Sequence, residues 1–244
     1  MEIKDFIEVM EGVRDQAELV DLTYTMEKDM PSWPTQPKYE SRVCESYETG
    51  GESFHCGISL SEHTGTHIDA PRHFIPGGSS VDQLAPGAVM GRGVVIHAEQ
   101  AGPLGLLTLE QILEFEARNG EIRAGDIVMI RFGWDERYAI GPGGAGYLKD
   151  WPGLSGEGAA YLADKKVAAV GCDTLALDVF GAPRYICHEI LLGRGIPIME
   201  NICNLSRLPA FSYVIGLPNR FKGGSGSPIR LVAFVQPNTS DGRK

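Results

Sequence analysis

The sequence lacks several features that would assign it to a common class of protein. Its five cysteines are widely spaced and include no Cys-x-x-Cys pair, which favours a reduced intracellular protein over a disulfide framework. No apolar run approaches the roughly 20 residues that span a bilayer, and the charged N-terminal stretch lacks the apolar core of a signal peptide. We therefore expect a cytoplasmic protein that does not cross a membrane.

Basic residues are also scarce, with 22 Lys and Arg against 32 Asp and Glu and a formal net charge of −10. This balance argues against nucleic acid and against an anionic membrane surface as partners, because both need basic patches. A small-molecule substrate remains compatible, since the local field in a cleft can oppose the overall sign. The sequence has no Gly-x-Ser-x-Gly elbow, so a serine hydrolase of that type is not indicated.

The length of 244 residues and the apolar content of 43% fit one domain of ordinary size, and we treat residues 1–244 as that single domain. Hydrophobic periodicity and capping signals predict helices alternating with short buried strands. Thr108 and Gln111, for example, have the spacing of a capping box at the start of a helix that Gly120 closes. The tail after Pro237 is polar and expected to be frayed. The predicted helices are 3–15, 109–119 and 156–165 with a short one near 188; the predicted strands are 54–61, 93–98, 126–131, 167–171, 195–201 and 231–235; and 135–152 is predicted to be a flexible loop.

The chemistry is concentrated in His63-Thr-Gly-Thr-His67-Ile-Asp69-Ala-Pro-Arg-His73, where three of the six histidines fall within eleven residues. If the chain after Gly65 is extended, His67 and Asp69 point to the same face, because side chains of a strand alternate. Gly65 permits a tight bend that brings His63 back towards them. Two imidazoles and a carboxylate suit Zn²⁺, Mn²⁺ or Fe²⁺, and His73 is left free to move protons.

Other interpretations of this cluster remain. Histidine and aspartate can form a pH-sensitive structural network without a metal. The His63-to-His67 spacing would also fit one face of a helix, as in zinc proteases. Gly65, two threonines and Pro71 disfavour a helix here, and no Glu follows His63 directly.

The segment HTGTHIDAPRHF resembles the HxGTHxDxPxHF signature of the cyclase family of metal-dependent hydrolases, which includes bacterial kynurenine formamidase and isatin hydrolase. Every fixed position of the signature is met, and the likeness extends from Asp21 to Arg230. The resemblance implies a compact α/β domain with a swivelling or barrel-like mixed-sheet core and flanking helices. It also implies a homo-oligomer, either a homodimer or a homotetramer.

The resemblance further implies a ligand set. His63, His67 and Asp69 match the ligands of the first metal, and His188 and Glu200 match the later ligand pair of the family. These two residues would hold a second metal, with Asp69 bridging the ions. The expected cofactor is therefore a divalent metal, Zn or Mn, present as one or two ions.

The implied reaction is hydrolysis of an amide C–N bond by metal-activated water, with His73 as general acid and base. The implied substrate is an aryl formamide or a cyclic amide such as isatin. Three aromatic residues, Trp33, Phe132 and Trp134, would suit a flat aromatic or heterocyclic amide, although a core role explains them almost as well.

One departure from the family pattern lies between Asp173 and Asp178, which are expected to be structural hydrogen-bond acceptors. The family has Asp-x-x-Ser-x-Asp here, and Ala176 stands in place of the usual Ser. The polar contact that this Ser would make is therefore in doubt, whereas the metal ligands are not affected.

Three alternatives stay open at the level of function. The chain could be a lactone or ester hydrolase of the same family, or a small-molecule-binding member that has lost turnover. The third alternative is nucleophilic catalysis by Cys187 beside His188, which has little support because sequence neighbours rarely face one another.

Overall fold

The computed structural model describes residues 3–237, so the predicted frayed tail after Pro237 lies outside the described residues. Four helices and twelve strands follow one another along this part of the chain, joined by short 3-10 turns. The helices are α1 (Ile3–Gln16), α2 (Leu109–Asn119), α3 (Gly156–Asp164) and α4 (Ile186–Gly193). The strands are β1 (Glu18–Asp21), β2 (Glu40–Glu45), β3 (His55–Ser59), β4 (His67–Asp69), β5 (Met90–His97), β6 (Leu106–Leu107), β7 (Ile127–Arg131), β8 (Gly153–Leu154), β9 (Ala169–Cys172), β10 (Ile198–Glu200), β11 (Phe211–Pro218) and β12 (Gly226–Val235).

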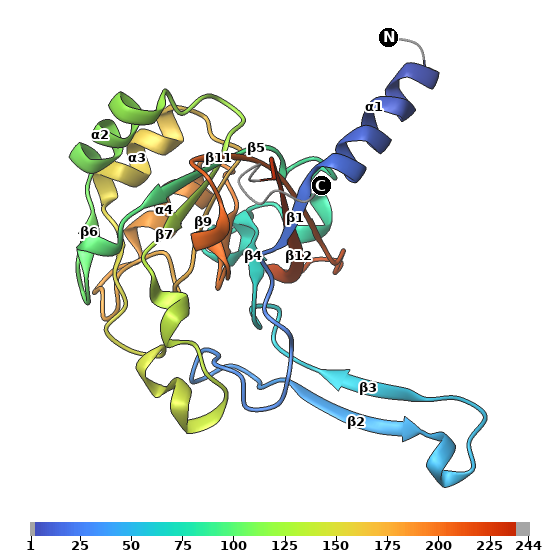
Figure 1. Ribbon diagram of the computed structural model, residues 1–244. Helices are drawn as coiled ribbons and strands as arrows, with labels where there is room; N and C mark the ends of the chain where they lie inside the picture. The colour runs from blue at the N-terminus through green and yellow to red at the C-terminus, as the bar shows by residue number, and fades with distance from the viewer. Residues whose placement is uncertain (1–2, 238–244) are drawn as a thin grey trace.

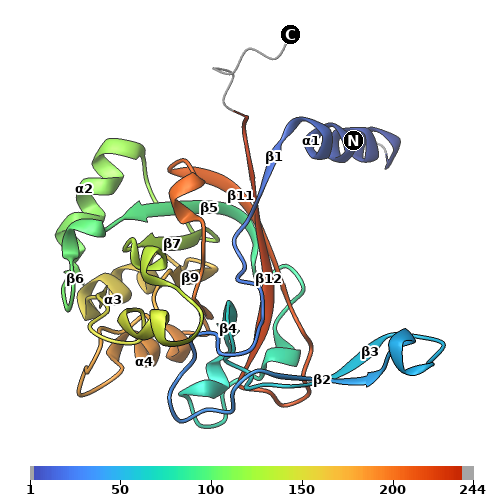
Figure 2. The ribbon, with the colours of Figure 1, turned by 60° about the horizontal axis from the view of Figure 1, so that its bottom comes forward.

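A closed mixed barrel forms the centre of the molecule (Figures 1 and 2). Eight strands make one sheet in the order β1-β12-β11-β5-β7-β9-β10-β4, and the pairing of β4 with β12 closes all of them except β1 into a ring. Strands β5, β7, β9 and β10 are parallel, whereas β4, β11 and β12 run antiparallel to their neighbours. The expectation of a single α/β domain with a barrel-like core is confirmed.

The parallel strands are buried on both faces, which explains their continuous apolar sequences. In β7, Val128 and Ile130 pack in one cluster with side chains of the covering helices. The alternate residues, Ile127 and Met129, belong to a second cluster with residues of β4, β11 and β12 inside the barrel. Each of these fully buried side chains contributes roughly 1.5–3 kcal/mol of transfer free energy, so the barrel wall joins two cores.

Helices α2, α3 and α4 cover one side of the barrel (Figure 1). The capping box predicted for α2 is present: the Thr108 hydroxyl accepts from the Gln111 peptide N–H, and the Gln111 side chain accepts from the Thr108 peptide N–H. The helix ends at Gly120, as predicted. The Ser155 hydroxyl likewise caps α3 by accepting from the peptide N–H of Gly158.

The segment 135–152, predicted to be a flexible loop, contains two short 3-10 turns, Trp134–Arg137 and Gly141–Gly146. Its far end is anchored in the core, because Tyr147 and Trp151 are buried. The indole N–H of Trp151 donates to the carbonyl of Asp178 over 2.9 Å. These anchors restrain the last third of the segment. The flexibility expected of residues 135–152 as a whole stays a prediction.

Two elements project from the body: α1 and the β2–β3 hairpin (Figures 1 and 2). The predicted helix at 3–15 is confirmed as α1, all of whose apolar side chains are exposed. The predicted strand at 54–61 is confirmed as the shorter β3, but it pairs only with β2, which the sequence analysis did not predict. The sequence analysis also missed strands β1, β6, β8 and β11.

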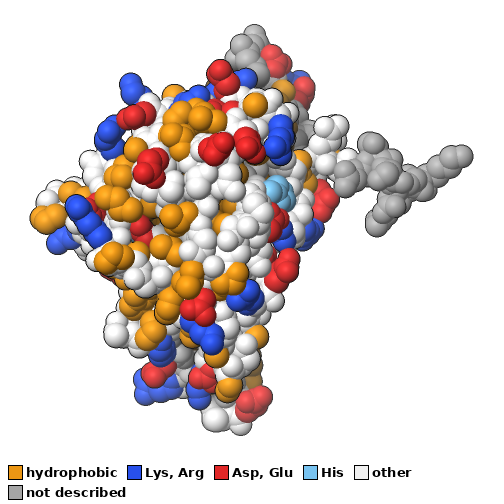
Figure 3. All heavy atoms as spheres, turned by 90° about the vertical axis from the view of Figure 1, so that its left-hand side faces the viewer, with side chains coloured by type: hydrophobic (Ala, Val, Ile, Leu, Met, Phe, Trp, Pro, Cys, Tyr) orange, Lys and Arg blue, Asp and Glu red, His pale blue; other side chains and the backbone are white. Residues whose placement is uncertain are grey.

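On the face drawn in Figure 3, Lys and Arg side chains are interspersed with Asp and Glu, and hydrophobic side chains gather in several patches between them. All five cysteines are unpaired, in agreement with the absence of a disulfide framework. No helix within residues 3–237 combines the length and the apolar character that crossing a bilayer requires.

Candidate metal centre and active site

The clustered histidines lie on the outer face of the barrel, between strands β4 and β10 and helix α4. Antiparallel pairing sets His67 opposite Glu200 and Asp69 opposite Ile198. His67 and Asp69 share the outer face, whereas Ile68 between them packs inside the barrel. The alternation predicted from the sequence is therefore observed, and Glu200 reaches the same face from the neighbouring strand.

His63 reaches this face through two glycines. Gly65 adopts φ +64°, a left-handed conformation that suits glycine and that turns the chain back before β4. At Gly226 a Cβ atom would lie only 2.6 Å from His63 Cε1, so the ring fits because that side chain is absent. Its Nδ1 atom lies 2.6 Å from Asp69 Oδ1, and its Nε2 atom lies 3.0 Å from Ser225 Oγ.

A second group of side chains meets Asp69 from the other side. His188, from α4, places its Nε2 atom 3.1 Å from Glu200 Oε1 and 3.5 Å from Asp69 Oδ2. The Nε2 atom of His67 lies 3.4 Å from Glu200 Oε2 and 3.4 Å from Asp69 Oδ1. Glu200 and Asp69 thus each contact histidines on two sides.

The outward-facing nitrogens of two histidines are held by acceptors. His67 Nδ1 lies 2.8 Å from the carbonyl oxygen of Gly65, and His188 Nδ1 lies 2.6 Å from Asp178 Oδ2. A carbonyl or carboxylate oxygen can only accept, so each Nδ1 carries the proton. The Nε2 atoms, which face the centre of the cluster, therefore have free lone pairs in the neutral rings, as metal ligation requires.

The donor set fits a divalent metal. The potential ligand atoms form two groups, within each of which all of them lie within 4.8 Å of one another, and Asp69 belongs to both groups. Asp69 Oδ2 is also a buried oxygen without a hydrogen-bond partner among the described residues, and such an atom normally finds a donor or a cation. Mixed imidazole and carboxylate sets of this kind suit Zn²⁺ and Mn²⁺. The structure brings together all five residues predicted as ligands: His63, His67, Asp69, His188 and Glu200.

Burial and mutual contact shift the pKa values in this cluster. Burial raises the pKa of Asp69, but its interactions with the adjacent His188 and His63 side chains outweigh the effect of burial and hold the pKa well below its ordinary value. Burial lowers the pKa of His67, but Asp69 and Glu200 raise it to about 10. The two buried carboxylates therefore attract positive charge, which protons or a metal ion can supply.

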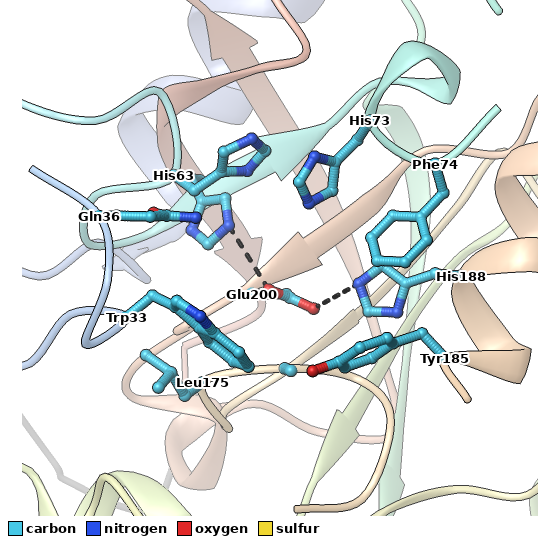
Figure 4. A pocket seen from close by; sticks show the side chains of 11 residues that line it. Trp33, Gln36, His63, His73, Phe74, Leu175, Tyr185, His188 and Glu200 are labelled. Carbon is cyan, nitrogen blue, oxygen red and sulfur yellow. Dashed lines mark ion pairs between the residues drawn. The ribbon is translucent and has the colours of Figure 1, made fainter. Parts of the chain in front are cut away.

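A cavity of about 260 Å³ opens directly over these ligands (Figure 4). His73 stands at its wall, with its Nε2 atom 3.8 Å from Asp69 Oδ2. Burial lowers the pKa of His73, so that its ring is neutral and able to accept a proton near pH 7. The cavity is lined by Trp33, Gln36, His63, His67, His73, Phe74, Leu175, Ala176, Tyr185, His188 and Glu200.

Only one of the three aromatic residues predicted to bind substrate lines this cavity. Trp33 does so, whereas Phe132 and Trp134 do not; they are buried in the core with 5% and 2% of their surface exposed. Their peptide N–H groups both donate to the carboxylate of Asp173, which turns the chain after β7 inwards. Both side chains therefore lie in the core, which the sequence analysis gave as the alternative to a place in the substrate site.

Several residues around the cavity were not identified from the sequence. Gln36, Leu175 and Tyr185 carried no motif, although Tyr185 precedes His188 by three residues and so lies near it at the start of α4. Phe74 closes the HTGTHIDAPRHF segment and could have been named on that basis. Asp178 was predicted only as a structural acceptor, and its contact with His188 requires the folded chain.

Cys187, the alternative nucleophile, is buried and turned away from the cavity. Its Sγ atom lies 3.0 Å from the carbonyl oxygen of Leu154. Burial raises the pKa of this thiol, and the carboxylate of Asp178 adds to the effect. Because the thiolate is the reactive species, the environment of Cys187 opposes a nucleophilic role.

Comparison with known proteins agrees with this geometry. The family model described as "Putative cyclase" matches residues 20–179. The chain is similar to the isatin hydrolase of Roseibium aggregatum, with 32% identity over 217 residues that cover 82% of each sequence. It is 27% identical over 214 residues to the kynurenine formamidase of Bacillus mycoides, covering 87% of this chain and 95% of that protein. A solved isatin hydrolase bound to the product analogue thioisatinate matches with a TM-score of 0.89 and 28% identity, over 97% of this chain and 100% of that one.

Proposed function

This chain belongs to the cyclase family, and from that premise we propose that it is a metal-dependent amidohydrolase that cleaves a non-peptide C–N bond of a small aromatic amide. The observation that carries the proposal is the position of Asp69. Its two carboxylate oxygens face different histidines, Oδ1 towards His63 and Oδ2 towards His188. A buried carboxylate shared in this way, beneath an open cavity, is suited to bridging two ligand groups.

The five clustered side chains would hold the metal. His63, His67 and Asp69 form one ligand group, and Asp69, His188 and Glu200 form the other. A divalent metal bound here supplies Lewis-acid chemistry, polarising a carbonyl oxygen and lowering the pKa of water from 15.7 towards about 7. Because the ligands are mixed nitrogen and oxygen donors, we propose Zn²⁺ or Mn²⁺, as one ion or two.

His73 is the proposed general acid and base. It lines the cavity beside the ligands without belonging to either ligand group. Its neutral ring accepts a proton from the attacking water and returns that proton to the leaving nitrogen. The ring centroid of His73 lies 4.0 Å from that of His63. Packing against His63 therefore holds the His73 ring at the edge of the cluster.

The cavity fits a planar substrate of one ring system. Its volume of about 260 Å³ is close to the lower end of the range for small-molecule sites, about 300–1,000 Å³. Trp33, Phe74 and Leu175 supply apolar walls. The similar proteins are named isatin hydrolase and kynurenine formamidase, so isatin and aryl formamides are the substrates that we propose to test first.

We also propose that the chain forms a homodimer or homotetramer in the cytoplasm. The supporting observation is the apolar surface of α1, which contacts little of its own subunit (Figure 1). A 14-residue helix is marginal alone in water, and contact with another copy would stabilise it.

The proposal is tested by assaying protein reconstituted with Zn²⁺ or Mn²⁺ against isatin, formanilide, and a matched lactone and ester. Hydrolysis of an amide substrate that stops with chelator and returns with metal is the expected result. Cleavage of only the lactone or ester would assign a different bond within the same family. Bound metal without hydrolysis of any compound would contradict the proposed activity.

A further inference from the structure

The carbonyl oxygen of Gly65 orients the ring of His67. His67 Nδ1 donates to this oxygen over 2.8 Å. The contact leaves Nε2 of the same ring facing Asp69 and Glu200, at 3.4 Å from a carboxylate oxygen of each. Whatever holds the Gly65 carbonyl in place therefore also holds a proposed metal ligand in place.

The side chain of Asn201 makes the second contact with this carbonyl. Its Nδ2 atom donates to the oxygen of Gly65 over 3.0 Å. A carbonyl oxygen has two lone pairs, and His67 and Asn201 use both. Asn201 directly follows Glu200, is buried, and has a positive φ of 54°, which asparagine tolerates better than most residues. Its own carbonyl oxygen accepts from the hydroxyl of Thr66, so Asn201 fastens two consecutive residues that precede β4.

Tyr147 contacts the other end of the Asn201 amide. Its hydroxyl donates to Asn201 Oδ1 over 2.7 Å, and the carbonyl oxygen of Asp173 lies farther away, at 3.1 Å. Because the oxygen of Gly65 can only accept, the amide nitrogen faces it and the amide oxygen faces Tyr147. The two contacts together define one orientation of the amide.

Trp134 places Tyr147 in turn. The indole N–H of Trp134 donates to the carbonyl oxygen of Tyr147 over 3.0 Å, and the ring of Tyr147 packs edge-on against that of Tyr138 at 5.3 Å. Tyr147 is fully buried. The segment 135–152 is therefore joined to the metal ligands by a continuous series of hydrogen bonds.

We propose that Asn201 is a positioning residue for the metal ligand His67, and that Tyr147 orients the amide of Asn201 for this role. The inference rests on the proposed function, because it requires that His67 binds a metal. Neither Asn201 nor Tyr147 lines the cavity, so contact with substrate does not explain their polar groups. Burying polar groups costs free energy that apolar side chains of similar size would avoid, whereas only a polar pair can fix the Gly65 carbonyl.

The test uses two variants and a control. Asn201→Gly removes the amide and keeps the left-handed backbone, which glycine adopts readily. Tyr147→Phe removes only a hydroxyl. Tyr161→Phe, the control, removes a hydroxyl that contacts Glu116 between the covering helices α2 and α3. The affinity of metal-free protein for Mn²⁺ and Zn²⁺ is measured by competition with a chromogenic chelator, and urea denaturation of the same samples gives their stability without metal.

Metal affinity separates positioning from a purely structural role. Loss of an outer contact to a metal-binding histidine typically costs 10- to 100-fold in metal affinity, and we expect a loss of this size for Asn201→Gly. Tyr147→Phe is expected to cost roughly 3- to 10-fold, the equivalent of one ordinary hydrogen bond. Tyr161→Phe is expected to lower the stability of the metal-free protein and to leave metal affinity unchanged.

The double variant tests whether Tyr147 acts through Asn201. In the Asn201→Gly background, Tyr147→Phe is expected to cause no further loss of metal affinity, because residues that share one network are not additive. A loss of the same size with and without Asn201 would overturn the proposed role of Tyr147. Metal affinities of Asn201→Gly and Tyr147→Phe equal to that of Tyr161→Phe would overturn the inference as a whole. If Asn201→Gly does not fold, the comparison of Tyr147→Phe with Tyr161→Phe decides.

Failure of the proposed function gives a different result. Wild-type protein that binds neither ion would overturn the metal centre and the positioning role together. Wild-type protein that binds metal but hydrolyses no amide would contradict only the proposed activity, and the affinities of the variants would still decide the role of Asn201.

Discussion

His188 Nδ1 lies 2.6 Å from Asp178 Oδ2, and both atoms are buried. The same carboxylate accepts the peptide N–H groups of Cys187 and His188, at 2.9 and 3.2 Å. Asp178 thus caps the start of α4 and fixes the ring of His188 at once. One residue couples the helix to the orientation of a proposed metal ligand.

Replacing Asp178 is therefore expected to weaken metal binding. Asp178→Asn keeps the size of the side chain but removes the charge that holds the proton on His188 Nδ1. Losses of this kind typically reduce metal affinity 10- to 100-fold, which competition with a chromogenic chelator would measure. Asp164→Asn, at an exposed aspartate paired with Arg194, is the matched control, and equal affinities for the two variants would rule out this role of Asp178.

Substitutions of His73 and His67 are expected to affect different properties, turnover in one case and metal binding in the other. His73→Ala removes the proposed proton carrier, which typically costs about 10²- to 10⁴-fold in kcat, and leaves the metal content intact. His67→Ala removes a ligand and is expected to lose metal. His97→Ala, at an exposed histidine outside the cavity, serves as the control. Full turnover by His73→Ala would contradict the assignment.

Gly226 tests the close approach between β12 and His63. A methyl group there would lie 2.6 Å from His63 Cε1 and 2.8 Å from the carbonyl oxygen of Ile68, and the backbone cannot move aside easily. Gly226→Ala is expected to cost roughly 1–3 kcal/mol of unfolding free energy and to reduce metal retention. Gly87→Ala, where a Cβ meets nothing within 4 Å, is the control for chemical denaturation; equal stabilities would show that the contact is relieved.

Asp173 makes stability depend on pH. Burial raises its pKa to about 7, although peptide N–H groups of Phe132 and Trp134 oppose the shift. Between about pH 4 and pH 7 the folded chain keeps a proton on Asp173 that the unfolded chain has released. The contribution of Asp173 to the free energy of unfolding therefore falls as pH rises to 7, by up to about 1.4 kcal/mol per pH unit. Above pH 7 its contribution is flat.

The measurement is urea denaturation of wild-type protein and Asp173→Asn between pH 5 and pH 8. The free energy of unfolding of the wild type, relative to the variant, is expected to fall from pH 5 to pH 7 and then to level off. A difference that does not change with pH would mean that the N–H donors keep the carboxylate ionised throughout.

Local patterns explain which parts of this molecule the sequence predicts. The period of two in His67-Ile68-Asp69 and the glycine before it placed two side chains on one face and a third nearby. The capping box at Thr108 placed the start of α2 for the same reason. Both signals act between residues that are close in the chain, so they can be recognised without the fold.

Long-range pairing explains most of the rest. Closure of the barrel joins β4 to β12, and the approach of Glu200 to His67 depends on strand register, which leaves no local signal. His188 and Glu200 could be placed only through the resemblance to the family. The aromatic residues Phe132 and Trp134 could belong to a core or a cavity on sequence grounds, and only the fold separates the two.

The most direct test of the account is the elemental metal content of protein purified without added metal, measured beside His67→Ala. The account predicts one or two transition-metal ions per wild-type chain and a clear loss in the variant. If neither sample holds metal, both are incubated with Mn²⁺ and with Zn²⁺ and measured again. Wild-type protein that binds neither ion, or a variant that binds as well as the wild type, would contradict the claim that these residues form a metal centre.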